Sequence, residues 1–213
     1  MPYPPGHKDQ TRTRIVHSAR KLFNRHGFEA VSIEQIMADA GLTVGGFYRH
    51  FDSKSDLYAE ALECFFTDPT WNGSWDGVRI DPLAIDVAPQ IIRAYLSPQH
   101  LAEIDGACPM VTLPGDVARG GASARQAYER AFKAMVAALQ RGAGDNGSSE
   151  RQIALATAAM CVGGMVVARA LADRALADEL REASLSIALE LAAADSTDAA
   201  GTHAAAEDHL DHL

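Results

Sequence analysis

Apolar side chains recur at spacings of three and four along most of this chain, the pattern of helices that bury one face. After residue 80, Asp81-Pro82 and Ser97-Pro98 each place a proline at the first position of a helix. No segment shows the apolar–polar alternation of a half-buried strand. The pattern therefore predicts an all-α protein, whose clearest helices cover residues 9–26, 33–40, 44–51, 55–66, 123–140, 149–172 and 173–194.

Two of the shortest predicted helices are separated by a tight turn. Ser32 is a residue type that caps the start of a helix, and Ala40-Gly41 ends the same helix because glycine accepts a left-handed backbone. Thr43 caps the next helix. Two helices joined by a short turn with glycine form a helix-turn-helix, whose second helix can lie in the major groove of DNA.

The second of these helices carries small or hydrogen-bonding residues and no acidic side chain. Gly45 and Gly46 each weaken a helix by about 0.8–1.0 kcal/mol relative to Ala, so we expect them where the backbone must approach another surface closely. At the next helix start, Lys54 and backbone N–H groups can grip a phosphate. The alternative is a tight turn in an ordinary helical bundle.

This segment resembles the DNA-binding domain of the TetR/AcrR family of bacterial transcriptional regulators, over roughly residues 9 to 60. Met37 departs from the family pattern, which usually has a small residue packing under the turn. The matching motifs are Arg20-Lys21-Leu22-Phe23, Gly27-Phe28, Ser32-Ile33, Ala40-Gly41-Leu42-Thr43, Gly46-Phe47-Tyr48-Arg49-His50-Phe51 and Ser53-Lys54.

The resemblance implies an N-terminal three-helix DNA-binding domain followed by a larger helical domain for ligand binding and dimerisation. We predict a disordered arm over 1–8, a helix-turn-helix DNA-binding domain over 9–54, a helical ligand-binding and dimerisation domain over 55–194, and a flexible tail over 195–213. We expect no cofactor and no resident metal, and the irregularly spaced tail histidines would hold a metal ion only weakly.

Charge separates the two predicted domains. The whole chain has a net charge of −9, but residues 1–56 hold eight Lys or Arg against six Asp or Glu. The remainder holds eleven basic against twenty-two acidic residues, so only the N-terminal part can approach phosphates comfortably. Three cysteines without CxxC spacing, and no secretory signal, predict a cytoplasmic protein.

Residues 150–194 are predicted to form a homodimer interface. From Ile153 to Ala168 only Thr157 is polar, and these residues rise about 24 Å, short of a bilayer core of about 30 Å. We therefore expect no membrane span, and a helix that is apolar all round must be covered by another surface. The resemblance implies a symmetric dimer, which presents two recognition helices to a palindromic double-stranded operator.

The resemblance also implies a small hydrophobic or amphipathic ligand among the later helices. Cys108 precedes a predicted helix start, where a thiolate would be reactive; the alternative is a small buried hydrophobe. The other candidates are aromatic or methionine side chains, which at helical spacing more often form plain core than a pocket. The candidate ligand-binding residues are Phe66, Trp71, Trp75, Tyr95, Cys108, Met110, Tyr128, Phe132 and Met160.

Together these observations predict a dimeric DNA-binding transcriptional regulator, a repressor that a small ligand releases from its operator. The alternatives are a switch by oxidation or electrophile modification of Cys108, and a DNA-binding protein without a small ligand. An enzyme is not expected, because HExxH, CxxC, Walker and GxSxG motifs are lacking. The predicted DNA contacts are Ser32, Thr43, Val44, Gly45, Gly46, Phe47, Tyr48, His50 and Lys54.

Overall fold

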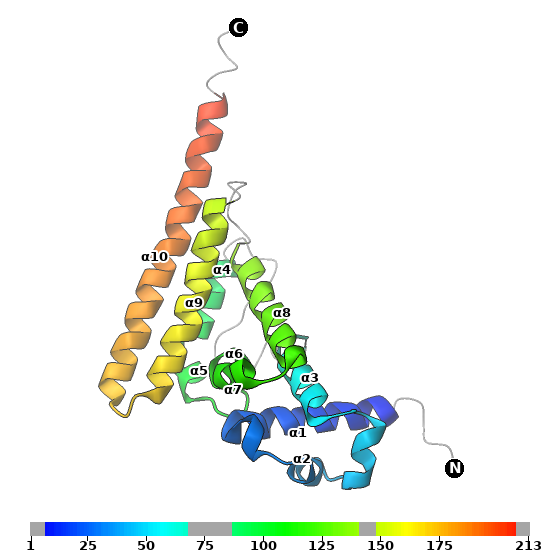
Figure 1. Cartoon of the computed structure of the whole chain (residues 1–213). Coiled ribbons are helices and arrows are strands. Elements are labelled where there is room, and N and C mark those ends of the chain that lie inside the picture. Colours follow the sequence, from blue (N-terminus) through cyan, green and yellow to red (C-terminus); the bar gives the residue numbers. More distant parts are fainter. Residues whose placement is uncertain (1–6, 68–86, 141–147, 208–213) are drawn as a thin grey trace. The chain divides into compact units, whose positions relative to one another are not determined.

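The computed structural model describes residues 7–67, 87–140 and 148–207, and within these ranges every regular element is a helix (Figure 1). This confirms the predicted all-α class. The predicted arm over 1–8 falls mostly outside the described residues, since the first helix, α1 (His7–Ala30), begins only at His7.

The chain forms two compact units, which do not follow the predicted domain boundaries. The first unit comprises Met1–Ser74 and Glu103–Ala131, and the second comprises Trp75–Ala102 and Phe132–Leu213. The first unit thus contains α1, α2 (Ile33–Asp39), η1 (Val44–Arg49), α3 (Lys54–Thr67), α6 (Pro109–Thr112), α7 (Pro114–Arg119) and the start of α8 (Ala122–Leu139).

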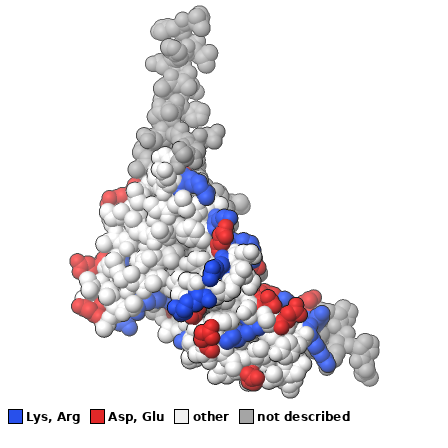
Figure 2. All heavy atoms as spheres, viewed as in Figure 1, with Lys and Arg blue, Asp and Glu red and all other residues white. Residues whose placement is uncertain are grey.

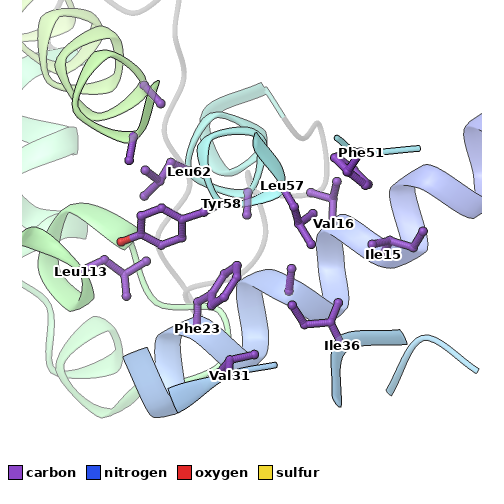
Figure 3. Packing of buried hydrophobic residues seen from close by; sticks show 14 of the residues in the cluster. Ile15, Val16, Phe23, Val31, Ile36, Phe51, Leu57, Tyr58, Leu62 and Leu113 are labelled. Atoms are coloured by element: carbon purple, nitrogen blue, oxygen red, sulfur yellow. The ribbon is translucent and has the colours of Figure 1, made fainter. Parts of the chain in front are cut away.

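Aromatic and aliphatic side chains from α1 and α3 form the core of the first unit. The rings of Phe23 and Tyr58 meet edge to face, with centroids 5.1 Å apart, an arrangement that the ring quadrupole favours. Figure 3 shows these two side chains turned toward each other, with Leu113 near the ring of Tyr58. Leu113 and Val117 belong to this core, so residues well beyond the predicted DNA-binding segment help to stabilise it.

Local signals place the ends of the short helices where the sequence predicts them. The Ser32 hydroxyl accepts from the N–H of Gln35 at 3.2 Å, and the Gln35 side chain accepts from the N–H of Ser32 at 2.8 Å, a reciprocal capping box. Gly41 has a φ of 66°, the left-handed conformation that glycine adopts without a Cβ penalty.

The predicted recognition helix is present, but it is a 3₁₀ helix and not an α-helix. The N–H of Gly46 bonds to the carbonyl of Thr43 at 3.0 Å, and the N–H of His50 bonds to that of Phe47 at 2.9 Å. Such i→i+3 bonds suit a six-residue element in which two glycines favour an α-helix poorly. Thr43 occupies the N-cap position without a side-chain capping bond.

The second unit is built on a long antiparallel helix pair, α9 (Ser148–Ala170) and α10 (Arg174–Glu207), with α4 (Val87–Tyr95) and α5 (Pro98–Ala102). A Cβ on Gly164 of α9 would lie 2.7 Å from the Ser184 hydroxyl of α10, so the two backbones approach closely there. The buried Arg181 of α10 donates to the carbonyl of Leu96 at 3.0 Å.

The helix α10 continues to Glu207, whereas the sequence predicts its end near Ala194 and a flexible tail from residue 195. The difference has a simple physical basis, because alanine is the best helix former and the extension is rich in alanine. Residues 149–170 of α9 meet the length and apolarity criteria for a membrane span, a test that buried helices of soluble proteins also pass.

Candidate nucleic-acid interface

The element η1 has one buried and one exposed face. Phe47 is completely buried, and its ring centroid lies 5.7 Å from that of Phe51. On the other face Tyr48 is 66% exposed and Val44 is 37% exposed. The buried Phe47 therefore anchors η1, while the opposite face exposes its backbone and the Tyr48 side chain to solvent.

The structure brings six of the predicted DNA contacts together on and beside η1, of which Thr43, Val44, Gly45 and Tyr48 are exposed and Gly46 and His50 are half-buried. Phe47 was predicted as a contact, but its full burial makes it part of the core. Ser32 uses its hydroxyl to cap α2.

The side chain of Lys54 is held within the first unit. Its ammonium donates to the carbonyls of Phe28 at 2.8 Å and Val31 at 3.0 Å, and it lies 4.2 Å from the centroid of the Phe28 ring. Two of its three donors are thus bound to backbone that leads from α1 into α2. This geometry gives Lys54 a structural role, and its predicted contact with a phosphate stays a prediction.

Two arginines of α1 are engaged in the same way. Arg12 donates through Nε to Glu60 at 2.9 Å, donates to the carbonyl of His50, and lies 4.1 Å from the centroid of the Phe51 ring. Arg14 donates to the carbonyl of Ala40, at the C-terminal end of α2. Both guanidinium groups therefore connect α1 to the helix-turn-helix.

Arg49 lies on η1 but is not among the predicted DNA contacts. It is exposed at the end of η1, and no described residue forms a hydrogen bond or ion pair with its guanidinium. A signal was available in the sequence, because Arg49 is the only Lys or Arg between Thr43 and Lys54.

The imidazole of His50 lies in a cationic environment. Burial lowers the pKa of His50 below its usual value of 6.5, and the nearby charges of Lys8, Arg12 and Arg49 lower it further. Both effects favour the neutral imidazole. It can donate one hydrogen bond to a phosphate oxygen without adding a fixed charge.

The predicted ligand-binding residues are distributed over both units. Trp71 and Trp75 lie outside the described residues, as does the side chain of Phe66. In the first unit Cys108 and Met110 are buried, and the Tyr128 hydroxyl donates to the carbonyl of Met110 at 3.2 Å. Burial and the nearby Cys108 raise the pKa of Tyr128 to about 12. The second unit contains Tyr95, Phe132 and Met160.

Two hollows lie beside α1 and α2, with volumes of about 470 and 420 Å³. Asp39 lines both hollows. The first is also lined by apolar residues such as Leu22 and Val31, and the second by polar residues such as Thr13. Neither hollow is lined by a predicted ligand-binding residue.

Residues 15–61 match the family model described as bacterial regulatory proteins, tetR family. The HTH-type transcriptional regulator AcrR of Shigella flexneri is 41% identical over 54 residues, 25% of each chain. The uncharacterized HTH-type regulator YfiR of Bacillus subtilis is 30% identical over 57 residues, 27% of this chain and 28% of that protein. The matched segment thus spans about a quarter of the length of these curated relatives.

Solved structures are similar over most of the chain. The reduced form of Escherichia coli NemR has a TM-score of 0.66 at 17% identity, covering 84% of this chain and 95% of NemR. A regulator from Saccharomonospora viridis in complex with choline has a TM-score of 0.56 at 17% identity, covering 83% and 94%. At such identities these likenesses concern the fold. The match over residues 15–61, together with the helix-turn-helix geometry, shows that this segment is a DNA-binding domain like that of the tetR family of bacterial regulatory proteins.

Proposed function

We propose that this protein is a cytoplasmic, dimeric transcriptional repressor that binds a palindromic operator and is released by a small ligand. The observation that carries the proposal is the exposed face of η1, which has no acidic side chain. The buried Phe47 anchors the opposite face of η1 in the core. An element that is anchored on one side and has an exposed backbone on the other suits insertion into a major groove.

On this face the contacts divide by chemistry. Thr43, Tyr48 and His50 carry hydroxyl or imidazole groups that hydrogen-bond to phosphates and set the orientation on the duplex. Val44, Gly45 and Gly46 have small or apolar side chains, or none, so they sit against base edges and thymine methyl groups. The capping box at Ser32 holds the preceding helix in register beneath them.

Dimerisation through residues 150–194 is supported by apolar side chains that α9 and α10 leave on their surface. Burying such side chains against a second copy is favourable at about 25 cal/mol per Å² of apolar surface. A two-fold axis would then present two copies of η1 to the two halves of a palindrome. The exposed large hydrophobic residues are Leu155, Val167, Leu176 and Ile187.

A small hydrophobic or amphipathic ligand would act by favouring a conformation with low operator affinity. The fold of the choline-bound S. viridis regulator supports this proposal, although choline is the ligand of that protein. Binding of ligand and operator must then be negatively coupled by the same factor in both directions.

Release from the operator by a thiol switch is the second candidate function. It is supported by the structurally similar NemR, whose structure is described as the reduced form. Cys108 is completely buried, so an oxidant or electrophile would reach it only after the surrounding helices open. Mass spectrometry after brief alkylation tests this: a switch requires Cys108 to react at least as fast as the half-buried Cys64, and slower reaction argues against it.

The test of the proposed function is a selection of duplexes from a random pool, followed by fluorescence-anisotropy titration of a selected duplex and an unrelated one. We expect sequence-dependent binding by the wild-type dimer, lost in Tyr48→Ala. Because Tyr48 is 66% exposed, we expect its truncation to leave the fold unchanged, which circular dichroism checks. Equal, weak binding to both duplexes would contradict the proposal.

A further inference from the structure

Most cations of the first unit are already engaged with other groups of the protein. Figure 2 shows several blue and red groups next to one another at the lower right of the drawn face, and the individual contacts identify the pairs of the first unit. The engaged cations are Arg12 with Glu60, Arg14 with the carbonyl of Ala40, Lys21 with Asp39, Arg25 with Asp105, Lys54 with the carbonyls of Phe28 and Val31, Arg119 with Asp116, and Arg130 with Glu63.

Among the described residues of this unit, three cations have neither a hydrogen bond nor an ion pair: Lys8, Arg49 and Arg125. All three are exposed. Lys8 lies in the first turn of α1 and Arg49 ends η1, and both act electrostatically on His50, so the two charges lie near the same imidazole. Arg125 lies on α8 and has no such relation to η1.

A cation that already holds carbonyl or carboxylate groups must give up those bonds before it can bind a phosphate. Arg49 gives up none, and its planar guanidinium matches a phosphate with two parallel hydrogen bonds. Lys8 adds a second positive charge beside the same imidazole. The engaged cations Arg12, Arg14 and Lys54 instead join α1 to the turn and to α2.

We infer that Arg49 and Lys8 supply the charged phosphate contacts of the helix-turn-helix unit, while Lys54, Arg12 and Arg14 position its helices. This inference rests on the proposed DNA-binding function and specifies which side chains provide its electrostatic component. It assigns that component to the end of η1 and the start of α1.

The test is the salt dependence of binding to a labelled duplex of mixed sequence, measured by anisotropy on the full-length protein. Non-specific binding depends on phosphate contacts, and each lost contact lowers the slope of log K against log salt by about 0.9. Arg49→Gln in both subunits of a dimer should therefore reduce the slope by about 1.8, and Lys8→Gln should reduce it in the same direction.

Arg125→Gln is the matched control, because it removes another exposed arginine of the same unit and should leave the slope unchanged. Lys54→Gln should lower the melting temperature and also leave the slope unchanged. The inference is overturned if Arg49→Gln and Lys8→Gln keep the wild-type slope, or if only Lys54→Gln reduces it. A wild-type protein without any salt-dependent binding would instead refute the proposed function itself.

Discussion

The carboxylate of Asp116 in α7 accepts a hydrogen bond from the backbone N–H of Phe28 at 2.9 Å, across a sequence separation of 88 residues. Gly27, with a φ of 77°, interrupts α1 immediately before Phe28. A Cβ on Gly27 would lie 3.0 Å from the same carboxylate oxygen. The kink in α1 is therefore completed by a side chain from a segment that the sequence assigns to the other domain.

Removing this acceptor should destabilise the first unit. In Asp116→Ala the part-buried N–H of Phe28 loses its partner, and we expect a loss of about 1–3 kcal/mol in the free energy of unfolding. Asp116→Asn keeps an acceptor oxygen and should lose less, although both variants lose the ion pair to Arg119. Urea unfolding measures the difference, and equal losses in the two variants would contradict the role of the hydrogen bond.

Gly45 should matter for DNA binding and not for the fold. A Cβ at Gly45 meets no atom within 4 Å, and its φ is not positive, so Gly45→Ala should melt at or above the wild-type temperature. If the backbone of Gly45 lies against base edges, the added methyl group should lower operator affinity by roughly tenfold or more.

Gly46→Ala is the control for this experiment. Its Cβ would lie 3.7 Å from Met37 Cε, an ordinary van der Waals contact, and Gly46 is half-buried. We expect a smaller loss of operator affinity than for Gly45→Ala. Wild-type affinity in Gly45→Ala would show that this residue does not approach DNA closely.

The adjacent glycines of α9 should respond differently to the same substitution. Gly164→Ala would place a Cβ 2.7 Å from the Ser184 hydroxyl and 3.1 Å from Ser184 Cβ, so we expect a loss of about 1–3 kcal/mol. A Cβ at Gly163 meets no atom within 4 Å, and Gly163→Ala should preserve or raise stability.

Ser184→Ala offers a second check, because it removes the nearer of the two contacts. The double variant Gly164→Ala/Ser184→Ala should recover part of the stability that Gly164→Ala loses, as measured by thermal unfolding. Absence of any recovery would mean that the Ser184 hydroxyl does not limit the approach of α9 and α10.

The buried His100 should make the protein sensitive to acid. Burial lowers the pKa of His100 from 6.5 to about 3, while the hydrogen bond between Nδ1 and the carbonyl of Tyr95, at 2.6 Å, opposes the shift. In the unfolded chain His100 takes up a proton near its ordinary pKa, whereas the folded protein does not. The contribution of the neutral His100 to the free energy of unfolding is therefore fully present above the ordinary pKa of histidine. This contribution is lost progressively as the pH drops toward 3.

Melting temperatures at about pH 7.5 and about pH 5 should show this loss, with a smaller difference in His100→Asn, which keeps a donor near Tyr95. The exposed His26→Asn is the control and should retain the wild-type difference. An NMR titration in which the His100 ring gained a proton near pH 6.5 in the folded protein would contradict the prediction.

Local signals allowed much of the helix-turn-helix to be predicted from sequence. The capping box at Ser32 and the left-handed Gly41 depend on neighbours within a few residues, so the residue types are enough to specify them. The apolar spacing likewise predicted the helices over 44–51 and 55–66, and the structure buries Phe51 and Leu57, which lie in these segments. The resemblance to the TetR/AcrR family depended on the same short motifs.

The tertiary structure decided which partner each polar or small residue has. The sequence shows that Lys54 is a cation and that Gly163 and Gly164 lack side chains. It does not show that Lys54 binds two backbone carbonyls, or that only Gly164 meets α10. The carbonyls follow from the course of the backbone, and Ser184 lies on a separate helix, so no local pattern encodes either contact.

The sequence by itself thus determined the all-α class, the two ends of α2 and the resemblance of the helix-turn-helix segment to the TetR/AcrR family. Only the tertiary structure decided that η1 is a 3₁₀ helix, that residues 103–131 complete the first unit, and that Arg49 remains unpaired among the described residues. The physical reason is the range of the interactions. Capping and helical periodicity act over one or two turns, whereas packing and charge pairing join residues that only the folded chain brings together.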